Sequence, residues 1–108
     1  MRRKENPQAA LELLILTTLR NGPNHGFGIA LRIEESSNAL LRVEEGSLYP
    51  ALHRMEKAGF IAAQWRKTPN GRRARVYRLT KAGRKRLQEI ERSWATLSEG
   101  VSRVLGWA

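Results

Sequence analysis

Four side chains that can donate hydrogen bonds lie within one short segment, namely Tyr49, His53, Arg54 and Lys57. Their spacing of three to four residues places them on one side of an α-helix. Leu48, Leu52 and Met55 recur at i, i+4 and i+7 and form an apolar stripe on the other side. Such a helix, docked by one face, can offer its donors to base edges in a DNA major groove. An ordinary amphipathic surface helix shows the same pattern, so the flanking sequence must decide.

The ends of this helix are marked by residues with strong positional preferences. Ser47 is predicted to be the N-cap, because its hydroxyl can accept a hydrogen bond from the first turn. Pro50 then falls inside the first turn, where a missing N–H costs little. Gly59 can adopt the left-handed conformation that ends a helix. The sequence therefore predicts a short helix between Ser47 and Gly59.

Composition narrows the class of partner. The chain has 108 residues, enough for one domain or for one domain with an appended helix. A net charge of +10 makes a polyanion the first partner to consider. No stretch is apolar for long enough to span a membrane and no secretory signal is evident, so we expect a cytoplasmic protein without a membrane partner. Without cysteine, and with only His25 and His53, no metal or other cofactor is predicted.

Two helices are predicted before the donor-bearing one. The first runs from Pro7, capped by Asn6, to about Asn21. Its leucines do not keep to one stripe, which suggests a second subunit that covers the helix. The second runs roughly from His25 to Ser36, with Asn24 as its cap. Its buried side is expected to contain Phe27, Ile29 and Ile33. Its glycines Gly26 and Gly28 either allow the close approach of a helix or a phosphate backbone or simply loosen the start of the helix. Leu40, Leu41 and Val43, in the connector that follows, could form one short strand.

After Gly59 the period of the sequence changes to two, which predicts a β-hairpin. The two strands centre on residues 61–66 and 75–79, and Thr68-Pro-Asn-Gly71 supplies the turn. Residues 66–86 contain ten Lys or Arg and no Asp or Glu. A run of charge is often only a solvated face, but this one directly follows the donor-bearing helix. We therefore interpret it as a phosphate-binding element.

The last element is predicted to be a helix that begins at Thr80. Apolar residues recur along it with spacings of three and four, which is the pattern of a heptad seam: Leu87, Ile90, Trp94, Leu97, Val101 and Val104. A seam on a terminal helix favours contact with a partner helix. We accordingly divide the chain into residues 1–80, a DNA-binding domain, and residues 81–108, a dimerisation helix.

The order of elements is that of a winged helix-turn-helix, mainly α with a small β-hairpin, to which an association helix is added. In its residues the chain resembles the PadR-type bacterial transcriptional regulators. The matching stretches are Leu14-Ile-Leu, Gly22-Pro-Asn-His-Gly-Phe-Gly-Ile29, Glu45-Gly-Ser-Leu-Tyr-Pro-Ala-Leu-His-Arg-Met-Glu56, Gly59-Phe-Ile61, Arg72-Arg-Ala74 and Val76-Tyr-Arg-Leu-Thr-Lys-Ala-Gly83. The block Gly46-Ser-Leu-Tyr-Pro-Ala-Leu52 is highly specific, whereas Phe27 stands where the family commonly has tyrosine.

The resemblance implies a homodimer that binds a pseudo-palindromic operator and usually represses. It implies that Ser47, Tyr49 and Pro50 begin the recognition helix and that residues 67–73 form the wing tip. It also implies that the first and last helices pack against those of the second subunit. The single C-terminal helix resembles that of a small subgroup, some members of which bind flat hydrophobic effectors through an aromatic residue. Trp94 occupies a comparable place, and the alternative is a plain interface side chain.

These considerations give each residue an expected role. Phosphates are expected to be bound by Arg66, Lys67, Arg72, Arg73 and Arg75, with Asn70 at the tip. Base edges are expected to be read by Tyr49, His53 and Arg54, beside Lys57, although Tyr49 could instead hold a phosphate. Dimerisation is assigned to Leu13, Leu16, Leu87, Ile90, Trp94, Leu97 and Val101.

Other functions remain as alternatives. No paired carboxylates, nucleophile motif or phosphate loop indicates an enzyme. A winged helix that binds RNA or a protein partner is the main alternative, although RNA readers usually carry more stacking aromatics than Trp65 and Tyr77. An anti-repressor that pairs with another regulator is a third.

Overall fold

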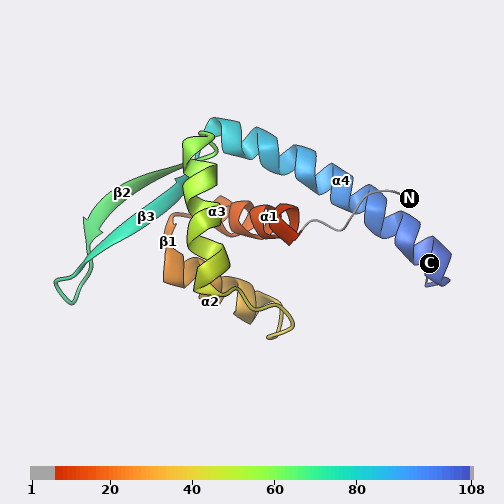
Figure 1. Ribbon diagram of the computed structural model, residues 1–108, viewed down its shortest axis with the longest axis horizontal. Helices are drawn as coiled ribbons and strands as arrows, with labels where there is room; N and C mark the ends of the chain where they lie inside the picture. Colours follow the sequence, from red (N-terminus) through yellow and green to blue (C-terminus); the bar gives the residue numbers. More distant parts are fainter. Residues whose placement is uncertain (1–6, 108) are drawn as a thin grey trace.

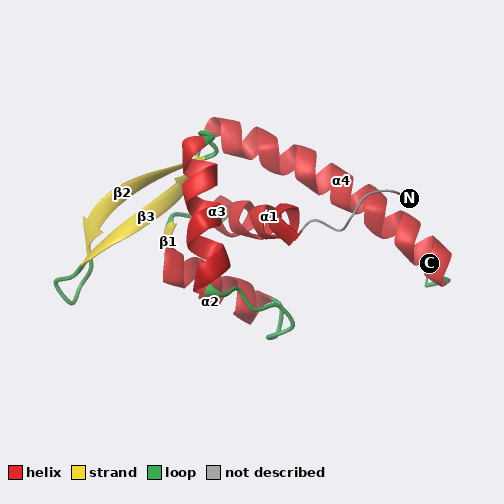
Figure 2. Ribbon diagram, in the orientation of Figure 1, coloured by secondary structure: helices red, strands yellow, loops and turns green. Residues whose placement is uncertain are grey.

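The computed structural model describes residues 7–107 and shows four helices and a small sheet packed around one core (Figure 1). The elements in order are α1 (Pro7–Arg20), β1 (Asn24–His25), α2 (Gly26–Ser36), α3 (Glu45–Lys57), β2 (Ile61–Lys67), β3 (Arg73–Leu79) and α4 (Lys81–Leu105). The strands form an antiparallel sheet in the order β1-β3-β2 (Figure 2). The predicted fold class, mainly α with a β-hairpin, is thereby confirmed. The predicted cap Asn6 lies outside the described residues.

Helix α1 forms the centre of the hydrophobic core. Its residues Ile15 and Leu16 are completely buried, and α2, α3, β3 and α4 all contact it. The apolar character of this helix therefore does not require a second subunit, contrary to the prediction. Leu16 in particular has no surface left for a partner, so its assignment to the dimer interface was wrong. Leu13 is only partly buried against the core.

Helix α3 begins earlier than the sequence suggested. The backbone N–H groups of Ser47 and Leu48 both donate to the carbonyl of Glu44, at 3.0 and 2.9 Å. Ser47 is consequently the third helical residue and not the N-cap, and Glu44 occupies the cap position without a side-chain hydrogen bond. Pro50 lies in the second turn of the helix and not in the first as predicted. A residue in the second turn normally donates its N–H to the carbonyl four residues earlier, and Pro50 has no N–H to donate to Gly46.

The end of α3 agrees with the prediction. Gly59 has a φ of 84°. Its N–H donates to the carbonyl of Glu56, and the N–H of Phe60 donates to that of Met55, each at 3.0 Å. These two bonds form a Schellman motif, which needs a residue with positive φ at this position. The motif turns the chain sharply from α3 into β2.

Helix α2 differs from the prediction at its start. His25 caps it, because its Nδ1 accepts a hydrogen bond from the N–H of Gly28 at 3.0 Å. Asn24 instead accepts from the N–H of His25 and belongs to β1, which pairs with β3 and was not predicted. Ile29 and Ile33 are buried as expected, but Phe27 is 65% exposed, so its assignment to the core was wrong.

The connector between α2 and α3 contains no strand, contrary to what Leu40, Leu41 and Val43 suggested. Asn38 and Ala39 have positive φ angles of 53° and 64°. Leu40 and Leu41 themselves bond locally, because their N–H groups donate to the carbonyl and the hydroxyl of Ser37, each at 3.0 Å, and not to a neighbouring strand. The connector instead turns the chain from α2 toward α3.

The hairpin of β2 and β3 is the wing of the fold. Its register pairs Ile61 with Leu79 and Ala63 with Tyr77, so the inner end of the wing contributes to the core. Toward the tip, Trp65 pairs with Arg75 and the side chains become exposed. The turn is closed by Thr68, whose hydroxyl donates to the carbonyl of Arg72 at 2.8 Å.

Helix α4 has one half in the core and one half beyond it. Thr80 caps the helix by accepting a hydrogen bond from the N–H of Gly83. Leu87 and Ile90 are buried in the core of the same chain, so their assignment to a dimer interface was wrong. Beyond Trp94, the helix projects from the globule with Leu97 and Val101 exposed (Figure 1).

Candidate nucleic-acid interface

The outward face of α3 carries a narrower set of donors than the sequence indicated. His53 and Lys57 are exposed, one turn apart, on the side opposite the buried Leu48, Leu52 and Met55. These two side chains are free to enter a groove. Ser47 and Pro50 are exposed on the same helix, nearer its start.

Tyr49 lies on the flank of α3 that faces α2. A Cβ at Gly26 would approach Tyr49 Cε1 to 2.8 Å, so the glycine leaves room for the tyrosine ring. The expected close approach at Gly26 is therefore confirmed, with α3 as the neighbour. Tyr49 remains 45% exposed and can still present its hydroxyl to a phosphate or a base.

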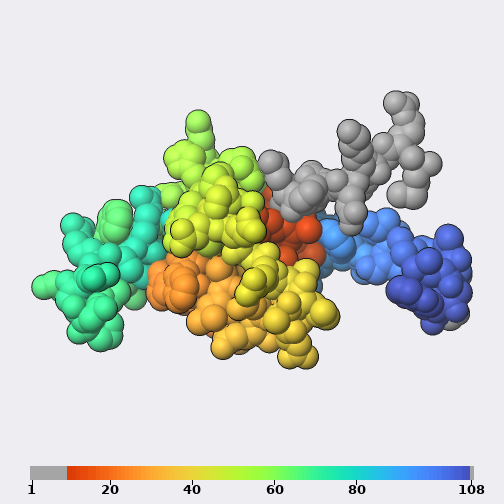
Figure 3. Space-filling model, turned by 60° about the horizontal axis from the view of Figure 1, so that its bottom comes forward, coloured from red at the N-terminus to blue at the C-terminus, as the bar shows by residue number. Residues whose placement is uncertain are grey.

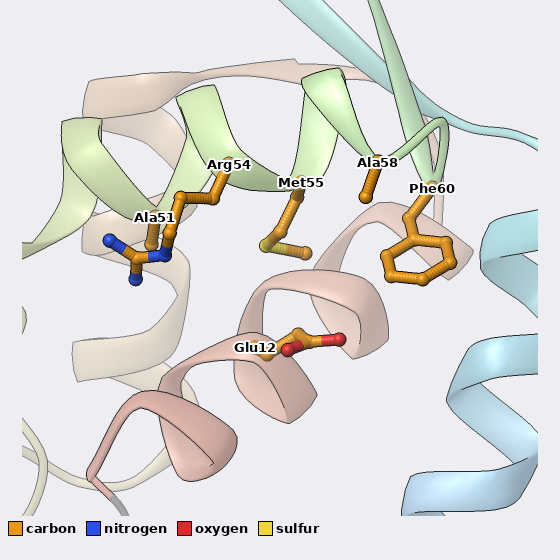
Figure 4. Close-up of a pocket in the computed structure, with 6 residues that line it drawn as sticks. All are labelled: Glu12, Ala51, Arg54, Met55, Ala58 and Phe60. Carbon is orange, nitrogen blue, oxygen red and sulfur yellow. The ribbon is translucent and has the colours of Figure 1, made fainter.

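Arg54 lies on the opposite flank of α3, beside α1. It lines a pocket of about 190 Å³ together with Glu12, Ala51, Met55, Ala58 and Phe60. Figure 4 shows its guanidinium below α3, on the side toward α1 and beside Ala51. The sequence pattern placed Tyr49, His53 and Arg54 on one face of the helix. In the structure only His53 is on the outward face, while Tyr49 lies on the flank toward α2 and Arg54 on the flank toward α1.

The wing carries a group of exposed cations near its tip. Arg66, Lys67, Arg72 and Arg73 are all exposed. Among the residues that the structure describes, five ion pairs form, and none of them uses these four side chains. Their charges are therefore available to an external anion.

The turn at the tip is held by local hydrogen bonds. Thr68 and Asn70 are joined through their side chains, and Gly71 has a φ of 84°. Asn70, predicted as a contact residue, thus also shapes the loop that carries Arg72. Figure 3 shows the wing and α3 as neighbours on one face, with α4 projecting at the opposite end.

Arg75 differs from the other wing arginines because it is already paired. It forms a salt bridge with Glu56 of α3. Its Nε is buried and has no hydrogen-bond partner in the described part of the chain. No local pattern pairs Arg75 with a residue nineteen positions away, because that contact depends on how the wing folds back beside α3.

Trp65 is the feature that sequence reasoning assigned no role in binding. It is 54% exposed on β2. The Cζ atoms of Arg73 and Arg75 lie 5.4 and 5.8 Å from the centre of its ring system, both within cation–π range. The signal was present in the alternation of the strands, since the predicted strands 61–66 and 75–79 bring Trp65 and Arg75 toward the turn at residues 68–71.

Tyr77 lies on β3 at the inner end of the wing, next to the core. Burial raises the pKa of its hydroxyl above 10.0, the positive charge of Arg75 opposes that shift, and Glu56 adds to it. The side chain is only 6% exposed, so it belongs to the core and not to the surface that could meet a ligand.

Within residues 7–107 there is no group of three or more His, Asp or Glu side chains arranged to hold a metal ion. No helix in the same part of the chain combines the length and apolarity needed to cross a membrane.

The architecture defines the class of protein. A helix-turn-helix pair, α2 and α3, followed by a two-stranded wing with free cations, is a winged helix-turn-helix, the arrangement of a DNA-binding module. Residues 15–89 match the family described as "Transcriptional regulator PadR-like family". The chain belongs to this family, and it is a transcriptional regulator and not an enzyme.

Individual relatives agree with this assignment. The chain is 40% identical over 103 residues to "Transcriptional regulator Rv3488" of Mycobacterium tuberculosis, a match that covers 95% of this chain and 90% of that protein. A PadR-like transcriptional regulator from Bacillus cereus superposes with a TM-score of 0.77 at 28% identity, over 91% of this chain and 93% of the other. A transcriptional regulator from Clostridium thermocellum gives a TM-score of 0.81 at 25% identity, over 89% and 93%.

Proposed function

We propose that this regulator binds double-stranded DNA sequence-specifically as a homodimer, on a pseudo-palindromic operator, and represses transcription in the bacterial cytoplasm. The observation that carries the proposal is the combined surface of α3 and the wing, where exposed donors lie next to cations that pair with no acidic side chain of residues 7–107. Groove-facing donors can select base pairs, and free cations can bind phosphates.

The wing supplies the sequence-independent part of the affinity in this proposal. Arg66, Lys67, Arg72 and Arg73 neutralise phosphates and release counterions. Each such contact changes the slope of log K against log salt concentration by about 0.9. Removing one of these charges therefore weakens binding to every sequence and makes the salt dependence shallower.

The test is a titration of a duplex at several salt concentrations, for the wild type and for Arg72→Ala. The matched control is Arg103→Ala, which removes the same charge from an exposed position on α4, where Arg103 pairs with Glu99 at 3.3 Å. We expect a slope smaller by about 0.9 for Arg72→Ala and an unchanged slope for Arg103→Ala. Equal slopes for all three proteins would contradict the proposed contact between the wing and the phosphates of the DNA backbone.

Sequence choice is assigned to α3. His53 and Lys57 face outward and reach base edges, whereas Tyr49 and Arg54 act from the flanks. A change at His53 should alter the ranking of operators, because it removes a contact to a base. A change at Arg54 separates two roles: a new ranking means base contact, and a uniform loss means phosphate contact.

Dimerisation is assigned to the projecting half of α4. Trp94 is partly buried against the core, while Leu97 and Val101 continue the apolar stripe into solvent. An exposed stripe of this kind is covered when a second copy packs against it. A two-fold dimer then presents two copies of α3 to two half-sites. The same chain measured as a monomer at micromolar concentration would contradict this part of the proposal.

Relief of repression by a small hydrophobic effector is assigned to Trp94. It depends on Trp94 alone, whose partly buried indole would line the space between two subunits. Because the chain has three tryptophans, the test compares ligand-induced fluorescence changes in the wild type and in Trp94→Phe. A response that persists in Trp94→Phe would reduce Trp94 to an interface side chain.

The competing function is an RNA-binding module, and the exposed Trp65 on the sheet is the observation that favours it. Competition between a DNA duplex and a single-stranded RNA at one stated salt concentration separates the two. The proposal expects the duplex to be preferred.

A further inference from the structure

Glu56 and Arg75 connect the recognition helix to the wing. Glu56 lies in the last turns of α3, Arg75 lies in the middle of β3, and their side chains are joined by a salt bridge. The side chains are only 30% and 40% exposed, respectively, so the pair is partly shielded from water. A partly shielded pair is screened less than a surface pair and restrains the two elements it joins.

Trp65 extends this connection along the wing. It lies opposite Arg75 in the register, and its ring system is near the guanidinium groups of both Arg75 and Arg73. An aromatic face orients a guanidinium and limits its rotamers. A chain of contacts therefore runs from Glu56 through Arg75 and Trp65 to Arg73.

The two arginines in this chain of contacts differ in whether their charge is free to bind a phosphate. Arg75 is matched by Glu56, whereas Arg73 has no acidic partner among the described residues. Without Arg75, the carboxylate of Glu56 would stand unpaired at the edge of a surface that meets phosphates, and it would repel them. Arg75 is thus occupied in compensating Glu56 and in holding the wing.

We propose that Glu56, Arg75 and Trp65 form a brace that fixes the position of the wing relative to the recognition helix, with Arg75 as a positioning residue and not a phosphate ligand. The brace rests on the proposed binding of duplex DNA. It assigns Trp65 to the presentation of Arg73, which is a phosphate ligand in the proposed function. The brace thereby couples the part of the protein that selects bases to the part that binds the backbone.

The first test measures salt slopes with two duplexes of about 30 base pairs, roughly three helical turns, one of mixed sequence and one enriched by selection with the wild-type protein. Arg72→Met loses a phosphate contact, so its slope should fall by about 0.9. Arg75→Met is combined with Glu56→Gln, so that no unpaired carboxylate is left to repel phosphates. This double variant should keep the wild-type slope, while its preference for the selected duplex falls. A slope for the double variant that falls as far as that of Arg72→Met would overturn the proposal.

Glu56→Gln gives an expectation of opposite sign. It releases Arg75, so the slope should become steeper by up to about 0.9 while the preference for the selected duplex again decreases. A merely structural role for the salt bridge would lower stability without making the slope steeper. An unchanged slope for Glu56→Gln, in a folded protein, counts against the brace.

Thermal unfolding and far-UV circular dichroism of each variant report on folding. If a single variant unfolds because one charge is left unpaired, the double variant Glu56→Gln with Arg75→Met removes both charges and should regain stability. The folded double variant should then keep the wild-type slope and lose preference for the selected duplex. A preference equal to that of the wild type would refute the brace.

Trp65 is tested by a matched pair of substitutions. Trp65→Phe keeps an aromatic face and should retain most of the affinity, whereas Trp65→Leu removes it and should bind both duplexes about two- to five-fold more weakly. Equal affinities for the two variants would show that the aromatic ring of Trp65 does not present Arg73 to the DNA. If the wild type itself shows no salt-dependent binding to either duplex, the proposed function fails, and that result is distinct from a failure of the brace.

Discussion

Gly83 allows α4 to lie against Phe60, in the turn between α3 and β2, and replacing it with alanine should show how much depends on that contact. A Cβ at Gly83 would lie 2.0 Å from the backbone carbonyl oxygen of Phe60 and 2.8 Å from Leu79 Cδ1. Cβ atoms do not approach other atoms to less than 3.0 Å, so α4 or the chain at Phe60 has to move by about 1 Å.

The carbonyl of Phe60 cannot move freely. It accepts hydrogen bonds from the N–H of Thr80 at 3.1 Å and from the hydroxyl of Thr80 at 2.9 Å. Overpacking costs about 1–3 kcal/mol, and weakening two hydrogen bonds adds about 1 kcal/mol each. The higher helix propensity of alanine returns about 1 kcal/mol. Gly83→Ala should therefore lower the free energy of unfolding by about 2–4 kcal/mol.

Gly100 provides the matched control, because it lies in the same helix and a Cβ there would meet nothing within 4 Å. Gly100→Ala should raise stability by up to about 1 kcal/mol through helix propensity alone. In thermal unfolding at one fixed protein concentration, we expect a melting temperature about 10–20 °C lower for Gly83→Ala. If the two variants were equally stable, the tight contact between α4 and Phe60 would be refuted.

Three further outcomes follow from particular contacts. Gly26→Ala should displace the ring of Tyr49 and weaken DNA binding with little loss of stability, since a side chain can move where a backbone cannot; unchanged affinity would free Tyr49 from that role. Tyr77 is neutral in the fold and its pKa is raised above 10.0, so its stabilising effect is complete below pH 10 and is lost as the pH rises further; denaturation of Tyr77→Phe should accordingly depend less on pH in that range. Replacing both Leu97 and Val101 by glutamate should give a monomer in sedimentation.

Local signals in the sequence predicted the elements well. The period-two strands, the turn at residues 68–71 and the glycine at position 59 each depend on neighbouring residues only, and each has its expected structure. Ser47 misled because serine favours the cap position but also occurs inside a first turn, and nothing local shows that Glu44 already starts the helix. Helix starts are therefore predicted less securely than glycine-marked ends.

Burial was harder to predict than secondary structure. Leu16, Leu87 and Ile90 looked like surplus apolar residues, yet packing of α4 across α1 buries them within one chain. Phe27 looked like core but lies in solvent. The pairing of Arg75 with Glu56 likewise depends on the angle between the wing and α3, which no short-range pattern encodes.

Footprinting on the duplex enriched by selection tests the central claim most directly. Two copies of α3 held by a two-fold axis should protect two patches related by symmetry and separated by about one helical turn, roughly 10 base pairs. That is the result we predict for the wild-type dimer. A single asymmetric patch, or uniform protection like that given by any basic protein, would contradict it.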